Sequence, residues 1–142
     1  MVRSRKLEVI QMAIKWVKEE ISTTGAPQNT GPYSQGILVG NLIYTSGEGP
    51  LDPVTGEIVE GTIEEQTRLV FRNLEAILNA AGASLHDVVK VTAHLEDIND
   101  FERFNSVYKE LFPGPVRPVR TTVGSQLTVR VEVDVVAVIP EG

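Results

Sequence analysis

The segment from Thr62 to Gly82 constrains the fold most, because it carries signals for the start, the period and the end of a helix. Thr62 followed by Glu65 is the T-x-x-E pattern of a capping box, in which the two side chains bond the free backbone N–H groups of the first turn. Gly82 can adopt the left-handed conformation that terminates a helix. The apolar residues recur at helical spacing and form one face that must be buried: Ile63, Val70, Leu74, Ile77, Leu78 and Ala81.

Strand patterns precede this helix. Residues 37–45 are two apolar runs separated by Gly40-Asn41, which is typical of a two-residue β-hairpin. Residues 52–56, with the sequence Asp-Pro-Val-Thr-Gly, predict a further turn.

The C-terminal half repeats the alternation of strand and helix. Residues 88–96 are rich in β-branched side chains and predict a strand, and residues 99–111 predict a second helix with an aromatic face. Three prolines end that helix and hold an extended loop. Two final strands are expected at about residues 120–126 and 129–139.

This order of elements predicts an α+β fold, a mixed sheet with two helices on one face. A bare opposite face would be a large apolar patch, which monomers avoid, so we expect an oligomer. Residues 26–142 are predicted to form a single domain and residues 1–25 an N-terminal extension. Within that extension, residues 13–21 can be read as a first strand or as part of a helix.

Composition excludes several classes of function. The chain has no cysteine and only two histidines, His86 and His94, so neither a thiolate nucleophile nor a well-ligated metal site is expected. A net charge of −6 and a sequence pI near 4.9 count against nucleic-acid binding, which depends on Lys and Arg neutralising phosphates. No apolar run approaches the length of a membrane span, and we predict a cytoplasmic protein.

The strand-like segment Val129 to Asp134 alternates valine with charged residues. The valines share one face, and Arg130, Glu132 and Asp134 share the other. These charges are either solvated on an outer face, or one carboxylate lies in a cleft and activates water as a general base.

Arg120 follows a proline-rigidified loop and enters a predicted strand. Its planar fork suits bidentate binding of a small carboxylate, which lysine cannot reproduce. The alternative is a surface or intersubunit salt bridge.

Four further residues are candidates for ligand contacts. Tyr33 lies in a turn-rich segment and can wall a pocket. Ser46 and Gly47 end a predicted strand, where a hydroxyl and backbone N–H groups can bind a carboxylate oxygen, whereas the adjacent Glu48 reads as a solvated residue. Asn105 points inward from the second helix, either to tie a loop or to contact substrate.

Taken in order, these pieces resemble the Rid family (reactive intermediate deaminases, also called YjgF). The resemblance runs from about residue 26 to residue 138 and rests on these segments: GPYSQG (31–36), TSG with Pro50 (45–50), DPVTGEIV (52–59), Gln66, Asn73, AAG (80–82), VVKVTAHLEDINDF (88–101), FNSVY (104–108), RPVRTTV (117–123) and VEVD (131–134).

The resemblance implies a chorismate-mutase-like fold with a six-stranded mixed sheet, assembled as a homotrimer with active sites between neighbouring subunits. It implies cofactor-independent hydrolysis of 2-imino and enamine acids, such as 2-iminobutanoate and 2-iminopropanoate, to 2-keto acids and ammonia. By motif position, Arg120 resembles the family's substrate-carboxylate arginine and Glu132 the glutamate that positions water. Tyr33, Ser46, Gly47 and Asn105 fall at its substrate-contact positions.

Two departures from the family pattern leave alternatives open. Glu48 stands where the family often has glutamine, and the segment before Glu132 is shorter than usual, which makes Asp134 a second candidate for the water-activating carboxylate. An endoribonuclease activity and a non-catalytic trimeric module that binds small ligands or acts as a chaperone are the rival functions.

Overall fold

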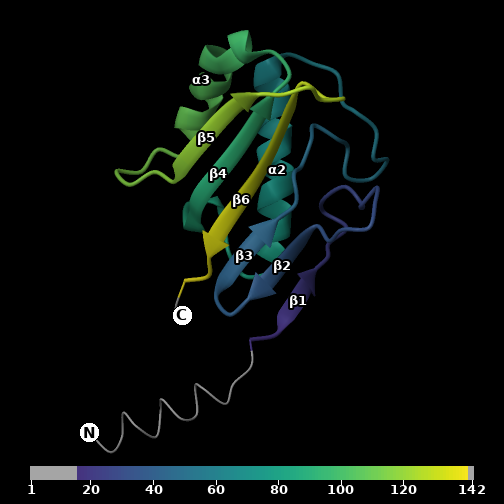
Figure 1. Cartoon of the computed structure of the whole chain (residues 1–142), viewed down its shortest axis with the longest axis vertical. Coiled ribbons are helices and arrows are strands. Elements are labelled where there is room, and N and C mark those ends of the chain that lie inside the picture. Colours follow the sequence, from purple (N-terminus) through teal and green to yellow (C-terminus); the bar gives the residue numbers. More distant parts are fainter. Residues whose placement is uncertain (1–15, 141–142) are drawn as a thin grey trace, which may run out of the picture.

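A computed structural model describes residues 16–140 and contains one mixed sheet of six strands with two α-helices packed on it (Figure 1). The strands lie in the order β1-β2-β3-β6-β4-β5, and only β4 and β5 run parallel. The elements are β1 (Lys18–Ile21), β2 (Gly36–Val39), β3 (Leu42–Thr45), α2 (Ile63–Ala80), the 3₁₀ turn η1 (Leu85–Asp87), β4 (Val88–Leu95), the 3₁₀ turn η2 (Ile98–Asp100), α3 (Phe101–Leu111), β5 (Val119–Gly124) and β6 (Val131–Val138).

The local signals in the sequence are confirmed. Gly40 has φ +63° at the turn between β2 and β3. Two-residue hairpin turns require a positive φ at their first central residue, which glycine adopts easily. Asp52 Oδ1 accepts hydrogen bonds from the N–H groups of Val54 and Thr55, and closes the predicted turn. Thr62 and Glu65 form the capping box of α2, and Gly82 beyond its end has φ +86°.

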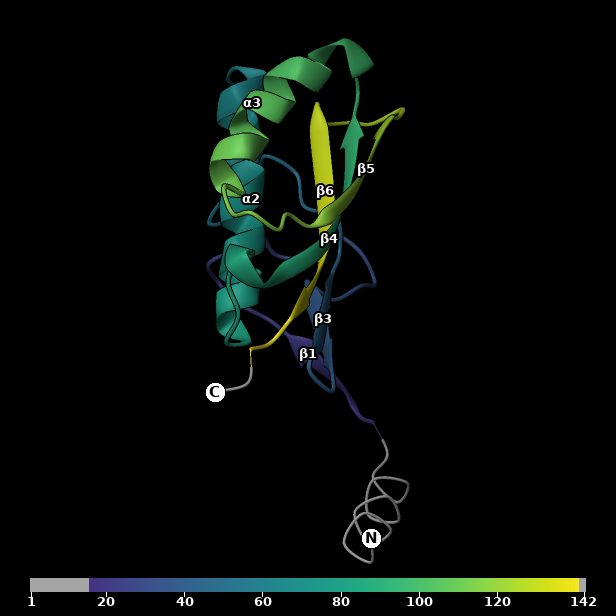
Figure 2. The same cartoon turned by 90° about the vertical axis from the view of Figure 1, so that its left-hand side faces the viewer.

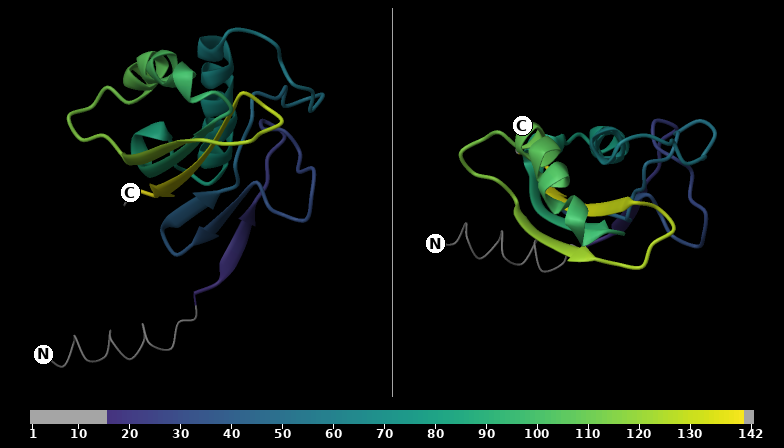
Figure 3. Two further views of the ribbon diagram at one scale, coloured as in Figure 1. Left: turned by 45° about the horizontal axis from the view of Figure 1, so that its top comes forward. Right: turned by 90° about the horizontal axis from the view of Figure 1, so that it is seen from above.

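Both helices cover the same face of the sheet (Figures 2 and 3). Alternate residues of the central strands point into this layer, so that Val91, Val133 and Val135 are buried against the helices. Four aromatic rings join the two helices: Phe71 of α2 packs edge-on against Tyr108 and Phe112, and tilted against Phe104. This cluster anchors α3, the helix that lies above β5.

The opposite face of the sheet carries no helix in the described part of the chain (Figure 2). The prediction that it would be a large apolar patch is wrong, because its centre is polar. Lys90, Thr92 and His94 of β4 lie beside Glu132 and Asp134 of β6, with valines and Tyr44 around them. Polar side chains leave such a face compatible with water, so exposure of this face alone does not require an oligomer.

The structure decides between the two readings of the N-terminal segment and moves the start of the second helix. Of the two readings offered for residues 13–21, Lys18–Ile21 forms a strand, β1, which pairs antiparallel with β2 at the sheet edge; the preceding residues to 15 lie outside the described part. The second helix begins at Phe101, after the 3₁₀ turn η2.

No helix within residues 16–140 combines the length and the apolar character that a bilayer crossing needs.

The capping box offers a test of this fold. Thr62→Ala removes the oxygen that accepts the Glu65 N–H bond (3.1 Å), and we expect it to lower the free energy of unfolding by about 1 kcal/mol, the usual loss for a threonine N-cap. Urea unfolding followed by far-UV circular dichroism measures the change. Thr24→Ala, at an exposed turn, is the matched control; an equal loss in the two variants would contradict a specific role of the cap.

Candidate functional site

Arg120 lies on β5 with its side chain against α3. The register pairs it with the buried Val91 of β4, so it projects toward the helices. Its guanidinium carbon is 4.5 Å from the ring centroid of Tyr108, 5.4 Å from that of Phe104 and 5.5 Å from that of Phe101. Cation–π contacts of this kind hold the guanidinium group in place while leaving its N–H groups free to bind an anion.

Three polar atoms of α3 and β5, the elements that contact and carry this arginine, have no partner among the described residues. Asn105 Oδ1, Tyr108 Oη and Thr122 Oγ1 are buried and make no hydrogen bond among the described residues. No acidic side chain of residues 16–140 forms a salt bridge with Arg120. Unsatisfied buried polar groups are costly, and they therefore mark a place prepared for a ligand or another chain. We name Arg120, Asn105, Tyr108 and Thr122 the arginine half-site.

This half-site bears on the prediction for Asn105 and adds two residues that were not predicted. Asn105 points inward as expected, but its amide ties no described loop, so the structural role offered for it is not seen. Tyr108 and Thr122 were not singled out from the sequence. Thr122 could have been, because it follows Arg120 by two residues in a strand and must share its face. Burial raises the pKa of Tyr108, against the opposing effect of Arg120 and Arg117, so its hydroxyl stays a neutral donor.

Glu132 lies on the other face of the sheet, between the buried Val131 and Val133 of β6. The backbone of Gly47 passes close to its carboxylate: a Cβ atom added to Gly47 would lie 2.8 Å from Glu132 Oε2. Any larger residue at this position would force the Glu132 side chain to move. Glu132, Gly47, Glu48 and Tyr33 line one cavity of about 240 Å³, and we name these four residues the glutamate half-site.

The alternative carboxylate, Asp134, lies two residues further along the same face. It does not line the cavity that Glu132 shares with Gly47 and Tyr33. Burial raises the pKa of Asp134, although the nearby His94 and Lys90 act against this. The geometry therefore favours Glu132 as the carboxylate that meets a ligand beside Gly47.

The hydrogen-bonding groups of Ser46 are already used within the chain. Its N–H donates to the carbonyl oxygen of Gln35 (2.9 Å), and its hydroxyl donates to that of Ser34 (2.6 Å). These bonds fix the loop that carries Tyr33, so the structure favours a positioning role for Ser46 rather than the direct contact predicted. Tyr33 itself is 48% exposed, and its hydroxyl bonds Thr30 Oγ1 (2.7 Å) at the rim of the cavity.

Glu48 is buried, with 7% of its surface exposed, so its interpretation as a solvated residue is wrong. Its backbone exchanges both hydrogen bonds with Val133, which turns the chain after β3 alongside β6. Burial, followed by the neighbouring charge of Glu132, raises the pKa of the Glu48 carboxyl to about 7. At neutral pH this carboxyl therefore holds a proton for a large part of the time.

The two half-sites of one chain cannot form a single pocket. Arg120 projects on the helix side of the sheet and Glu132 on the other, and β4 lies between their strands. A ligand small enough to fit the glutamate half-site could not reach Arg120 of the same chain.

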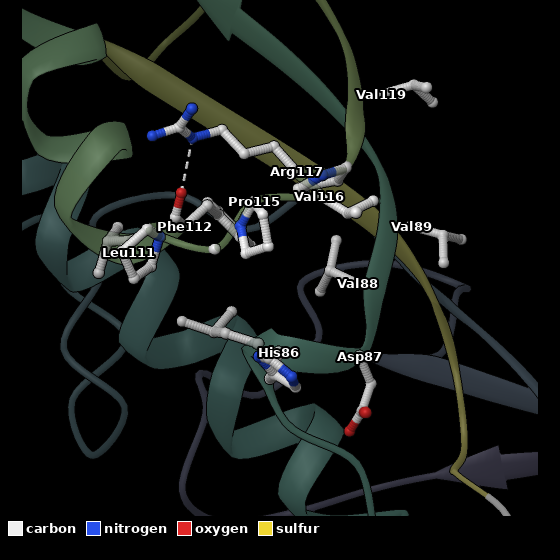
Figure 4. Close-up of a pocket in the computed structure, with 14 residues that line it drawn as sticks. His86, Asp87, Val88, Val89, Leu111, Phe112, Pro115, Val116, Arg117 and Val119 are labelled. Carbon is white, nitrogen blue, oxygen red and sulfur yellow. Dashed lines mark hydrogen bonds between the residues drawn. The ribbon is translucent and has the colours of Figure 1, made fainter.

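A further hollow lies elsewhere, between η1 and the segment that joins α3 to β5 (Figure 4). It measures about 630 Å³ and is walled mainly by valines, prolines and Leu111. Arg117 stands at its edge, where its Nε donates to the carbonyl oxygen of Phe112 (2.7 Å). None of the predicted site residues lines this hollow.

The burial of Glu48 makes a prediction about stability. The folded chain binds the proton of Glu48 more tightly than the unfolded chain does, because its pKa rises from 4.5 to about 7. The resulting stabilisation is complete below pH 4.5 and is lost as the pH rises through 7. Glu48→Gln cannot ionise, so we expect it to match the wild type at pH 4.5 and to exceed its free energy of unfolding at pH 8, by on the order of 3 kcal/mol.

Urea unfolding at the two pH values measures this difference. Glu102→Gln removes the same charge from an exposed position of α3 and serves as the matched control. A gap between Glu48→Gln and the wild type that is the same at pH 4.5 and pH 8 would contradict the buried, protonated carboxyl.

Comparison with known proteins places the chain in a family. Residues 23–139 match the family model described as Endoribonuclease L-PSP. A RutC family protein of Pyrococcus abyssi is 57% identical over 106 residues, which are 75% of this chain and 83% of that protein. The 2-iminobutanoate/2-iminopropanoate deaminase of Mus musculus is 41% identical over 124 residues, which are 86% of this chain and 92% of the mouse protein.

The fold has matching solved structures as well. The crystal structure of the Rid family protein YyfA from Yersinia pestis superposes with a TM-score of 0.83 and 39% sequence identity, covering 87% of this chain and 100% of that one. The ordered motifs, the topology and these matches agree, and the chain belongs to the Rid/YjgF family.

Proposed function

We propose that this protein hydrolyses 2-imino acids to 2-keto acids and ammonia, in an active site that joins the arginine half-site of one chain to the glutamate half-site of a neighbouring chain. The proposal rests on the surroundings of the Arg120 guanidinium. Its guanidinium is held over three aromatic rings and has no carboxylate partner in the described part of the chain, and α3 and β5, which contact and carry it, bring three unpartnered polar atoms. A small carboxylate would satisfy these groups together.

The opposite orientation of the half-sites supports an arrangement between chains. A second copy whose glutamate face docks beside α3 and β5 would bring its Glu132 toward Arg120. We propose a closed homotrimer for this assembly; the number three follows from the family resemblance, and the need for a neighbour follows from the geometry.

The chemistry needs few groups because an imine carbon is already electrophilic. The carboxylate of the substrate binds the Arg120 guanidinium, and Asn105 Oδ1 accepts a hydrogen bond from the imine or from water. Glu132 orients a water molecule and takes its proton as the oxygen attacks the carbon, in the manner of a general base. Collapse of the resulting carbinolamine releases ammonia and the 2-keto acid.

The mouse relative supports this substrate class by its name, a deaminase of 2-iminobutanoate and 2-iminopropanoate. No metal or organic cofactor enters the proposed reaction. Within residues 16–140, no group of three His, Asp or Glu side chains is placed to hold a metal ion; the absence of a cofactor stays a prediction.

The matched family model carries the name of an endoribonuclease, which keeps RNA cleavage as the rival activity. The net charge of −6 weighs against it, because phosphate binding gives most of the affinity of proteins for RNA. A non-catalytic module would bind 2-keto acids at Arg120 without accelerating imine decay.

Two substitutions test the proposed site. An amino-acid oxidase generates the imine, semicarbazide traps what is not hydrolysed, and the loss of semicarbazone measures the activity. We expect Arg120→Lys to lower kcat/KM by on the order of 10- to 100-fold, because an ammonium group lacks the bidentate fork. Glu132→Gln should lower kcat by about 100-fold or more, the usual contribution of a general base.

Arg72→Ala removes an exposed arginine of α2 and is the matched control, which should keep wild-type activity. Full kcat/KM in Arg120→Lys would contradict the assignment of the anion site. RNA cleavage that disappears with Arg120, in a wild type inactive on imines, would favour the rival activity.

A further inference from the structure

The cavity of the glutamate half-site has an apolar side that the proposed reaction leaves unused. The cavity measures about 240 Å³, and Leu51, Ile58 and Val129 line it together with Glu132. These three apolar residues come from two segments, the one that follows β3 and the one that precedes β6. Aliphatic side chains therefore lie beside the carboxylate that we assign to the reacting water.

Two glycines of the segment after β3 face this cavity. Glu48, which lies between Gly47 and Gly49, pairs directly with Val133, whose side chain is buried on the helix side of the sheet. Successive residues of an extended segment point to opposite faces, so the two glycines face the side on which Glu132 lies. The Glu132 carboxylate fills the space where a side chain of Gly47 would be.

The second of these glycines, Gly49, lies beneath two apolar side chains. A Cβ atom added to Gly49 would lie 3.6 Å from Cγ1 and Cγ2 of Val129 and 3.8 Å from Cγ of Leu51. Gly49 is not among the glycines with positive φ, so the backbone conformation does not require glycine here. The missing side chain instead adds to the width of the cavity. We name Gly49, Leu51, Ile58 and Val129 the aliphatic wall.

Hydrogen bonds hold both segments of the aliphatic wall in place. Asn73 of α2 is buried, and its side-chain amide donates to the carbonyl oxygens of Gly49 (3.3 Å) and Leu51 (2.9 Å). On the other segment, Arg130 follows the last residue of the wall and donates to the carbonyl oxygen of Gly61 (3.0 Å). A pocket fixed from both sides keeps its width, and a constant width is what selection by size needs.

The charges around the cavity favour an uncharged ligand group beside the aliphatic wall. Among residues 16–140, no lysine, arginine or histidine lines the cavity, whereas Glu132 brings a carboxylate. A negatively charged side chain of a substrate would lie near that carboxylate without a compensating cation, which is unfavourable. An aliphatic side chain would be removed from water there, and its binding becomes more favourable with each added carbon.

We propose that the aliphatic wall binds the side chain of the substrate and makes the protein selective for 2-imino acids with leucine-sized aliphatic side chains. This inference rests on the proposed imine hydrolysis and names its substrate class. The substrate carboxylate binds Arg120 of one chain, and the water held by Glu132 of the neighbouring chain attacks the imine carbon. The side chain begins at that carbon and extends into the cavity beside Glu132, where it meets the wall.

The semicarbazide assay measures this selectivity as a ratio, kcat/KM for the imine of leucine divided by kcat/KM for the imine of alanine. We expect a ratio of about 10 or more in the wild type, because each methylene group in an apolar pocket contributes on the order of 10-fold or more to discrimination. The imine of glutamate, which carries a second carboxylate, should be hydrolysed more slowly than the imine of leucine.

Gly49→Ala narrows the pocket by one methyl group, which the surrounding distances accommodate. We expect it to lower the leucine-to-alanine ratio by on the order of 10-fold and to change kcat/KM for the alanine imine by less than about twofold. Val129→Phe fills the pocket from the opposite segment and should lower the ratio further. Gly114→Ala is the matched control and should keep the wild-type ratio, since the Cβ atom would lie 3.8 Å from the carbonyl oxygen of Val116.

Binding of the product gives a readout that does not depend on turnover. In isothermal titration calorimetry, the wild type should bind 4-methyl-2-oxopentanoate, the keto acid that corresponds to leucine, more tightly than pyruvate by about 10-fold or more. Gly49→Ala should reduce this difference, because the longer side chain no longer fits beside Val129.

The outcomes separate this inference from the function on which it rests. A wild type inactive on every imine overturns the proposed function and the substrate class with it. An active wild type that hydrolyses the alanine imine as efficiently as the leucine imine overturns the role of the aliphatic wall alone, and so does an unchanged ratio in Gly49→Ala. A wild-type preference for the leucine imine that both Gly49→Ala and Val129→Phe reduce supports the inference.

Discussion

Two helices cover one face of a six-stranded sheet, and this one-sided layering is the constraint on which the proposed site depends. Because side chains alternate along a strand, each residue of β5 and β6 is committed to the helix side or to the open side. Arg120 falls on the first and Glu132 on the second. The proposed site, which needs both a fixed cation and a carboxylate base, is then incomplete in one chain, and we propose that a second chain completes it.

The hydrophobic core and the arginine half-site share aromatic residues. The rings of Phe71, Phe104, Tyr108 and Phe112 join α2 to α3, and the rings of Phe104 and Tyr108 also lie under the guanidinium of Arg120. Phe104 and Tyr108 therefore stabilise the helix pair and also position the guanidinium that we propose binds the substrate carboxylate. Substitutions there would alter stability and ligand binding together, which distinguishes them from changes at the exposed Arg72.

Much of the fold could be predicted because its signals are local. The capping box of Thr62 and Glu65, the Gly40 turn and the alternation of residues 131–135 each depend on backbone geometry within a few residues. Helix and strand ends were less exact: η2 precedes α3 where a continuous helix was expected, since Asp97 caps the 3₁₀ turn and competes with an earlier α-helical start.

The site was harder to predict because its properties depend on contacts distant in sequence. Ser46 donates its N–H and its hydroxyl to the carbonyl oxygens of Gln35 and Ser34. Glu48 is buried where it pairs with Val133, 85 positions further along the chain. The helical spacing placed Tyr108 in the core, and its ring is indeed buried there. Its unpartnered hydroxyl and the contact of its ring with Arg120 are what mark it as part of a site. The motif order of the family singled out Arg120, Glu132 and Asn105 as candidates, but it did not show that Arg120 and Glu132 project on opposite sides of the sheet.

Subunit complementation tests the central claim most directly. Arg120→Ala and Glu132→Gln chains, carrying different affinity tags, are co-expressed, and oligomers that contain both are isolated and assayed for imine hydrolysis. In the proposed closed homotrimer, every oligomer that contains both variants has one junction of three that pairs an intact Arg120 with an intact Glu132, so the isolated mixed oligomers should regain about a third of wild-type activity. If purified mixed oligomers stay as inactive as either parent while the wild type is active, Arg120 and Glu132 do not meet across an interface, and the account is wrong.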